Sequence, residues 1–181
     1  MMIREMKPSD VPQVAEIEAQ CFSVPWSKQG FWDSIARDDT IFLVAVKPDF
    51  EQMDLKQEVA DCVKTGSDET QSVVDEGRNT CLEKEDLILG YIGMYISFEE
   101  GEITNVAVSS KYRKHGIGNH LVTAMQRAAK EKNLERMILE VRATNEPALS
   151  LYKRKGFTEL GIRKNFYEKP TEDAIIMSCA L

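Results

Sequence analysis

Hydrophobic residues recur along the chain with two different spacings, which together predict a mixed α/β protein. Short apolar or alternating runs predict strands at residues 2–6, 41–46, 87–97, 102–108, 137–141, 158–162 and 174–179. Apolar residues three and four positions apart predict helices at residues 9–20, 28–37, 117–132 and 145–156. The predicted order is β-α-α-β-β-β-α-β-α-β-β, which is typical of helices packed against one sheet.

Residues 48–86 interrupt this pattern because they are polar and strongly acidic. They hold 12 acidic and 4 basic residues, whereas the rest of the chain holds 18 acidic and 19 basic residues. Connections between neighbouring strands are usually short, so we expect a surface insertion within a single domain that spans residues 1–181. An acidic arm that recruits or mimics a basic partner is the alternative, and a contact between Cys62 and Cys81 could hold such an arm together.

Composition limits the class of protein to which the chain can belong. Hydrophobic residues make up 43% and charged residues 29% of the chain, which is ordinary for a soluble globular domain. No apolar run reaches the roughly 20 residues of a membrane span, and the N-terminal residues contain no apolar stretch of the signal-peptide type. The cysteines are widely spaced, so we expect a cytoplasmic protein with reduced thiols and no metal site.

The most informative segment is a basic, glycine-containing turn between the predicted strand 102–108 and the predicted helix 117–132. Gly116 and Gly118 allow the backbone to approach a ligand closely, and the free N–H groups of a helix N-terminus favour an anion. Nearby basic side chains strengthen that preference; they are Lys111, Arg113, Lys114 and His115. Neither the Walker sequence nor the dinucleotide-binding fingerprint is present, because the residues after Gly118 do not match them.

Several motifs elsewhere in the chain, taken together with this turn, resemble those of a known family. The pattern Arg113, Gly116, Gly118 is followed by a Leu-Glu-Val-Arg-Ala-Thr-Asn stretch at 139–145, Leu151-Tyr152 and Gly156-Phe157, and it is preceded by Pro25-Trp26-Ser27. Together with Glu172-Asp173-Ala174-Ile175-Ile176-Met177 near the end, the chain resembles the RimI branch of the GNAT N-acetyltransferases over residues 1–47 and 87–181. This resemblance implies the GNAT fold, a mixed and mostly antiparallel sheet flanked by helices, with acetyl-CoA as co-substrate and no metal.

The resemblance also implies an activity and its acceptor. Members of this branch acetylate the N-terminal alanine of a small-subunit ribosomal protein, so we expect that partner and no direct contact with nucleic acid or membrane. Two alternatives stay open: acetylation of another protein N-terminus, a lysine or a small amine, and a non-catalytic module that binds CoA. The sequence does not determine the oligomeric state.

Two residues are candidates for the chemistry, and each also has a purely structural explanation. Glu140 alternates with Leu139 and Val141 and matches the position of the family's base, although an exposed glutamate paired with Arg142 would give the same pattern. Tyr152 is the candidate acid that protonates the leaving thiolate, although helical tyrosines commonly serve only in packing.

The remaining predicted contacts divide between the two substrates. For acetyl-CoA, the resemblance implies the backbone of one strand, the basic turn and the cap of the following helix; these residues are Val106, Ala107, Val108, Arg113, Lys114, His115, Gly116, Ile117, Gly118, Asn119 and Asn145. For the acceptor peptide it implies Trp26, Arg163 and Tyr167, although Trp26 could equally fill the core beneath a loop.

Overall fold

The computed structural model describes residues 1–47 and 86–181, in which Met1–Lys47 and Ile88–Leu181 form one compact unit. The prediction of an acidic insertion at 48–86, together with a contact between Cys62 and Cys81, lies outside the described residues except for residue 86. No helix in the described part of the chain is long and apolar enough to cross a membrane.

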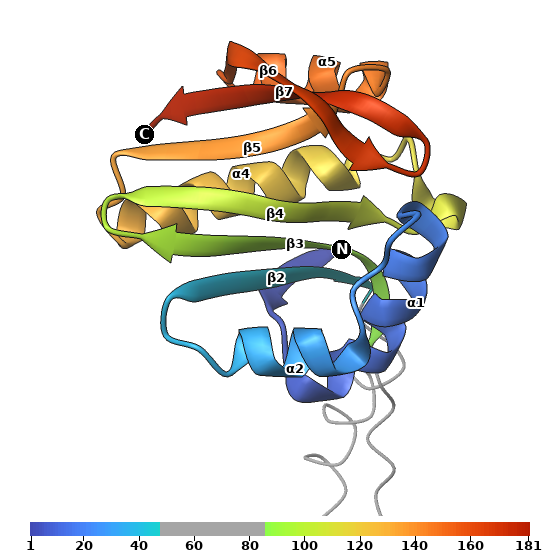
Figure 1. The fold of residues 1–181 in the computed structure, drawn as a ribbon. Helices are drawn as coiled ribbons and strands as arrows, with labels where there is room; N and C mark the ends of the chain where they lie inside the picture. The colour runs from blue at the N-terminus through green and yellow to red at the C-terminus, as the bar shows by residue number, and fades with distance from the viewer. Residues whose placement is uncertain (48–85) are drawn as a thin grey trace, which may run out of the picture. The chain divides into compact units, whose positions relative to one another are not determined.

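The order of strands and helices confirms the predicted α/β arrangement (Figure 1). The strands are β1 (Met2–Glu5), β2 (Thr40–Lys47), β3 (Leu87–Ser97), β4 (Glu100–Val108), β5 (Arg136–Arg142), β6 (Thr158–Glu168) and β7 (Thr171–Ala180). The helices are α1 (Val11–Cys21), α2 (Lys28–Ile35), α4 (Ile117–Glu131) and α5 (Glu146–Arg154), with short 3-10 turns η1 (Pro8–Asp10) and η3 (Ser110–Tyr112).

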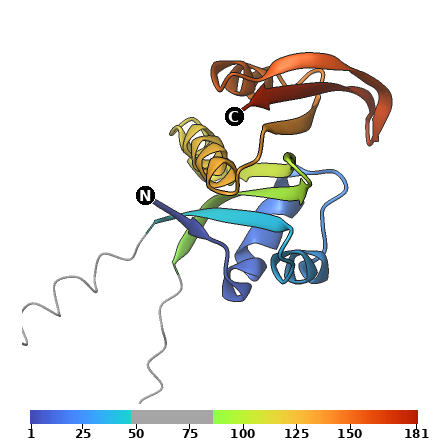
Figure 2. The same ribbon diagram turned by 90° about the vertical axis from the view of Figure 1, so that its left-hand side faces the viewer.

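All seven strands form one sheet in the order β1-β2-β3-β4-β5-β7-β6. Strand β4 pairs antiparallel with β3 and parallel with β5, while β7 pairs antiparallel with both β5 and β6. Helices α1 and α2 cover one face of the sheet, and α4 covers the other (Figure 2). The mixed sheet is therefore buried on both faces near its centre.

Each face has its own hydrophobic core. The core under α4 and α5 is made of large aliphatic and sulfur-containing side chains, including Leu121, Met125, Met94, Leu139 and Met177. The core under α1 and α2 is partly aromatic and includes Val14, Phe31, Phe42, Val44 and Tyr91. Successive side chains of β2 enter opposite cores, which explains why this strand is a continuous apolar run.

Helices α2 and α5 begin close to where the sequence predicted, because a side chain caps the N-terminus of each. Ser27 caps α2 by accepting a hydrogen bond from the Gly30 N–H at 3.1 Å. Asn145 caps α5 in the same way, accepting from the Ala148 N–H at 3.3 Å, as the sequence predicted.

The first helix and the hairpin between β3 and β4 differ in detail from the prediction. Helix α1 begins at Val11, after a 3-10 turn, because the Asp10 carboxylate is engaged by Arg4 at 2.6 Å and by the Lys7 N–H at 2.7 Å. The hairpin turns at Phe98 and Glu99, with Phe98 in the left-handed region at φ 54°, so β4 begins at Glu100, two residues before the predicted strand. Neither difference alters the topology.

We predict that Gly93→Ala will destabilise the fold. A Cβ at this position would overlap the ring of Phe42, which cannot retreat because it packs against Trp26, Phe31 and Tyr95 at centroid distances of 6.2–6.5 Å. Overpacking of this kind costs about 1–3 kcal/mol in the free energy of unfolding, measurable by urea denaturation. Gly161→Ala is the matched control, since its Cβ would meet nothing within 4 Å. Equal stability of the two variants would contradict this account.

Candidate active site

A cleft of about 570 Å³ opens where β4 and β5 separate. The two strands pair only from Glu100↔Arg136 to Ile103↔Leu139, although β4 continues to Val108 and β5 to Arg142. Beyond Ile103, no described strand pairs with the edge of β4 that faces β5. That edge therefore offers backbone N–H and C=O groups to an extended ligand.

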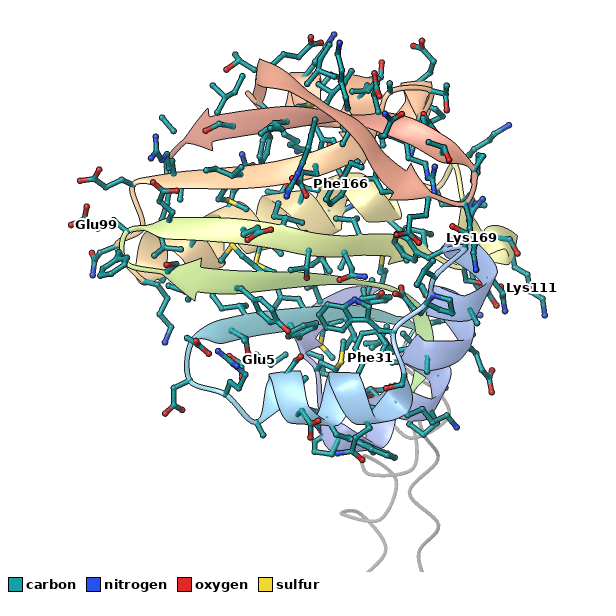
Figure 3. All side chains as sticks on the ribbon, viewed as in Figure 1. Glu5, Phe31, Glu99, Lys111, Phe166 and Lys169 are labelled. Atoms are coloured by element: carbon teal, nitrogen blue, oxygen red, sulfur yellow. The ribbon has the colours of Figure 1, made fainter. Side chains whose placement is uncertain are left out.

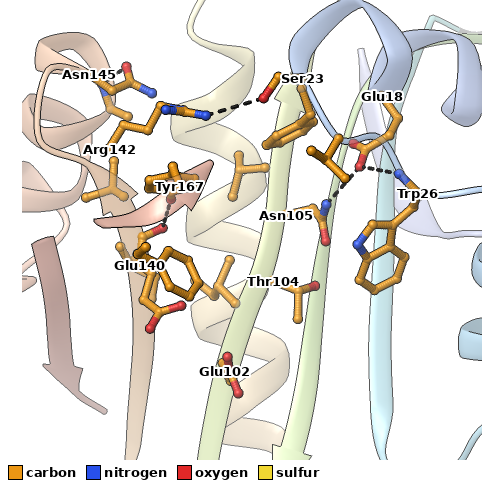
Figure 4. Close-up of a pocket in the computed structure, with 18 of the residues that line it drawn as sticks. Glu18, Ser23, Trp26, Glu102, Thr104, Asn105, Glu140, Arg142, Asn145 and Tyr167 are labelled. Carbon is orange, nitrogen blue, oxygen red and sulfur yellow. Dashed lines mark hydrogen bonds between the residues drawn. The ribbon is translucent and has the colours of Figure 1, made fainter. Parts of the chain in front are cut away.

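Three parts of the chain form walls around the cleft (Figure 4). The segment between α1 and α2 supplies one wall and the β6 strand the opposite wall, with α5 at one end. Phe166 of β6 lies over the exposed front of the sheet, and Lys111 lies at the edge of the molecule beyond the end of β4 (Figure 3). The β6 wall, predicted to contact the acceptor peptide, and the basic turn, predicted to bind the diphosphate, therefore lie at different ends of the region around the cleft.

The basic turn fits a diphosphate in its backbone geometry. Gly116 is the N-cap of α4 with φ 76°, a left-handed conformation, and as a glycine it has no side chain with which to cap the helix. The first-turn N–H groups of Ile117, Gly118 and Asn119 therefore receive no hydrogen bond from an N-cap side chain. Lys111 and Lys114 are exposed beside them.

Arg113 and His115 make contacts within the protein that the sequence did not predict. The Arg113 guanidinium donates to the Val108 carbonyl at 3.1 Å and to the Cys21 Sγ at 3.2 Å. The His115 Nδ1 lies 2.8 Å from the Arg113 carbonyl oxygen. These contacts link the turn to the end of β4 and to α1, so both residues help to shape the loop, whatever they contribute to phosphate binding.

Glu140 faces the cleft, as strand alternation predicted, but its charged partner is not the expected one. Arg163 Nη1 lies 2.6 Å from Glu140 Oε1, and only 20% of the Glu140 side chain is exposed. The Tyr167 hydroxyl donates to the Glu140 backbone carbonyl at 3.3 Å. Arg142 instead pairs with Glu172 at 3.0 Å, so the expectation of a Glu140–Arg142 pair is wrong.

Tyr152 lies at the α5 end of the same cleft. Its ring is buried against Phe157, with a centroid distance of 5.7 Å, and no hydrogen bond to another described residue engages its hydroxyl. Burial, reinforced by the nearby Tyr167, raises the pKa of the Tyr152 phenol. The hydroxyl therefore stays protonated at neutral pH and can act as a donor.

The other residues predicted for the site, besides Glu140 and Tyr152, make the following contacts. Trp26 lines the cleft and also packs on Phe31 at 5.4 Å between ring centroids, so its position is compatible with either of the two roles considered. The Asn145 Oδ1 is occupied by the helix cap, which leaves its amide nitrogen for a ligand. Tyr167 is stacked beneath the Arg142 guanidinium at 4.1 Å from the ring centroid, and Arg163 lies over Phe166 at 4.6 Å.

Sequence reasoning missed two residues that hold the walls in place. Arg142 donates to the carbonyls of Pro170 at 3.2 Å and Lys169 at 3.1 Å, and reaches Ser23 Oγ at 3.4 Å, so it connects β5 to both walls. Glu18 is completely buried, and this burial raises its pKa despite hydrogen bonds that oppose the shift. A signal for Glu18 existed, because it falls four residues after Val14 on the apolar face of α1.

The comparisons agree with this geometry. The sequence model of the Acetyltransferase (GNAT) family matches residues 49–157. The chain is 30% identical over 175 residues to the putative [ribosomal protein bS18]-alanine N-acetyltransferase of Bacillus subtilis, covering 97% of this chain and 92% of that relative. It is also 37% identical over 87 residues to the [ribosomal protein bS18]-alanine N-acetyltransferase of Escherichia coli, covering 46% of this chain and 57% of that relative.

Solved structures show the same fold. The crystal structure of the ribosomal-protein-S18-alanine N-acetyltransferase from Escherichia coli has a TM-score of 0.70 at 22% identity and covers 99% of this chain and 92% of its own. Arabidopsis thaliana NAA60 in complex with acetyl-CoA has a TM-score of 0.73 at 18% identity, with 99% and 98% covered. The family match, the near full-length relative and a cleft shaped for an extended ligand agree, and the chain belongs to the GNAT family of acetyl-CoA-dependent N-acetyltransferases.

Proposed function

We propose that the protein acetylates the N-terminal alanine of the small-subunit ribosomal protein bS18. The observation that carries this proposal is the cleft between β4 and β5, which holds Glu140 and Tyr152 together beside an unpaired strand edge. The Bacillus subtilis relative that aligns over nearly the whole chain is named as a [ribosomal protein bS18]-alanine N-acetyltransferase, which supports this acceptor.

The acceptor amine has to be neutral before it can attack the thioester. An α-amino group has a pKa near ~8, well below the ~10.4 of lysine, so a carboxylate can deprotonate it directly or through a water. We assign this role to Glu140. Its ion pair with Arg163 holds the carboxylate at the cleft surface, where an incoming ammonium can share it.

The second half of the reaction needs a proton for the leaving thiolate. We assign that proton to Tyr152, whose phenol stays protonated in its buried position and has no competing hydrogen bond among the described residues. Val106, Ala107 and Val108 would hold the pantetheine arm of acetyl-CoA along the free edge of β4. The turn at 113–119 and the Asn145 amide would bind the rest of that substrate.

We also propose that catalysis resides in residues 1–47 and 86–181, and that residues 48–86 are an insertion within this single domain. The support is that the cleft, the basic turn and both candidate catalytic residues all come from the described ranges.

Acceptor specificity is the direct test of the proposal. We expect acetyl-CoA and the protein to add one acetyl group to bS18, detected by intact mass, and tandem mass spectrometry should place it on the N-terminal alanine. Matched peptides that begin with alanine should be modified, while the same peptides with a blocked N-terminus and an internal lysine should not. Turnover confined to small amines or to lysine side chains would overturn the proposal.

Removing either catalytic group should lower kcat. Tyr152→Phe and Glu140→Gln should each reduce kcat by about 10²-fold or more, the usual contribution of general acid–base catalysis, while the KM for acetyl-CoA stays unchanged. The decrease in kcat of Glu140→Gln should be largest at low pH, where more of the acceptor amine is protonated. Glu159→Gln is the matched control, an exposed β6 glutamate that pairs with Lys153. An unchanged kcat in Tyr152→Phe would reject the assignment of Tyr152 as the acid.

Gly118→Ala should change the binding of acetyl-CoA without lowering the stability of the fold. A Cβ at Gly118 would meet Leu151 Cδ2 at 3.4 Å, an ordinary contact, and alanine is favoured over glycine in a helix by roughly 1 kcal/mol. We therefore expect an unchanged or higher melting temperature but a raised KM for acetyl-CoA, because a methyl group in the first turn of α4 would hinder the close approach of the diphosphate to the backbone N–H groups proposed to bind it. An unchanged KM would show that the diphosphate does not approach this residue.

A further inference from the structure

Two polar atoms in the floor of the cleft have no hydrogen-bond partner among the described residues. They are Thr104 Oγ1 and Asn105 Oδ1, both buried, and the Asn105 residue is only 6% exposed. Both residues line the cleft. A buried polar atom without a hydrogen-bond partner is unfavourable. Asn105 Oδ1 can only accept and the Thr104 hydroxyl can accept as well as donate, so a ligand that supplies donors would satisfy both.

The backbone explains why these two neighbours reach the same cleft. The pairing of β3 with β4 moves from Gly93↔Asn105 to Met94↔Ile103, so Thr104 is an extra residue in a β-bulge. In a regular strand, adjacent side chains would point to opposite faces. The bulge changes that alternation and brings Thr104 and Asn105 to one site.

Glu18 determines which way the Asn105 amide is turned. Its carboxylate accepts hydrogen bonds from Asn105 Nδ2 at 3.1 Å, from the Trp26 N–H at 3.2 Å and from the Tyr91 hydroxyl. Glu18 Oε1 accepts from both the Trp26 N–H and Asn105 Nδ2, so it holds the amide nitrogen toward itself and leaves the Asn105 oxygen turned away, as Figure 4 shows.

The charge near these atoms favours a cationic donor. Glu102 lines the cleft two residues before Thr104, and no ion pair within the described residues neutralises it. Arg142, the positively charged residue among those that line the cleft, is already paired with Glu172. A ligand rich in N–H donors and positively charged would therefore match the site better than a neutral or anionic one.

We propose that Thr104 Oγ1 and Asn105 Oδ1 form an acceptor subsite that binds the N–H donors of the acceptor's first residue, with Glu18 as the positioning residue that orients Asn105. This inference rests on the proposed function, because it takes the α-ammonium of a polypeptide as the ligand. Thr104, Asn105 and Glu140 all line the same cleft, so an amine bound at the subsite would share that cleft with its proposed base.

Thr104→Val tests the subsite without disturbing the bulge. Valine has the same branched shape as threonine but lacks the hydroxyl, which has no partner to lose in the free protein. We expect an unchanged or higher melting temperature, an unchanged KM for acetyl-CoA and a KM for the alanyl peptide raised about tenfold, as for one hydrogen bond to a charged group. Thr104→Ser should restore the KM, and Thr158→Val on β6 is the matched control.

Glu18→Gln tests the positioning role. Its amide would present a donor where a carboxylate accepts three, so Asn105 should lose its fixed orientation and the KM for the peptide should rise while that for acetyl-CoA does not. Calorimetric binding of the free-amine peptide and its N-acetylated form, in the presence of CoA, adds a readout independent of turnover. Wild type and Thr104→Val should differ in affinity for the first peptide and not for the second.

The outcomes separate this inference from the proposed function. If Thr104→Val leaves the KM of the amine unchanged, or raises both KM values equally, the subsite is overturned even though N-terminal acetylation stands. If the protein acetylates only small amines, the proposed function fails, and the same Thr104→Val comparison made with that amine decides the subsite.

Discussion

Strands β4 and β5 remain hydrogen-bonded for only four residue pairs, and the rest of the site depends on this limit. Past Ile103 and Leu139 the two strands separate, although each continues for several residues. The gap leaves backbone groups on β4 without a strand partner in the middle of a sheet, which would be unfavourable unless solvent or a ligand satisfies them. A binding cleft is thus a direct consequence of the sheet's own geometry.

Two polar side chains hold the walls of this cleft. Glu18 connects the loop before α2 to β3 and β4, while Arg142 connects the end of β5 to the turn between β6 and β7. Each makes several hydrogen bonds, and because Glu18 is completely buried, losing one of its donors would leave a buried carboxyl group poorly satisfied. The walls are therefore fixed by a small number of residues whose hydrogen bonds act together, and the aromatic packing around Trp26 adds to their rigidity.

The bulge at Thr104 connects the fold with the chemistry. One extra residue in β4 changes the alternation of side chains at the point where β5 departs. The strand after the bulge directs Val106 and Val108 toward the core under α4, and Asn105 toward Glu18. The same local irregularity thus sets both the free strand edge, proposed to hold acetyl-CoA, and the polar floor proposed to bind the amine.

The order of elements, both helix caps and the left-handed glycine turn could be predicted from the sequence, because they depend on local spacing and on the conformational preferences of Ser27, Asn145 and Gly116. The motifs also located Glu140 and Tyr152, since alternation and family resemblance concern positions along the chain. Other features depend on contacts between residues far apart in sequence. Glu140 pairs with Arg163 rather than Arg142 where β5 meets β6. The buried Glu18 network forms where α1 meets β3 and β4, beside the oxygens of Thr104 and Asn105 that have no partner among the described residues. The sequence determines which polar side chains the protein has. Only the folded sheet determines which of these side chains are buried together and which remain available to a ligand.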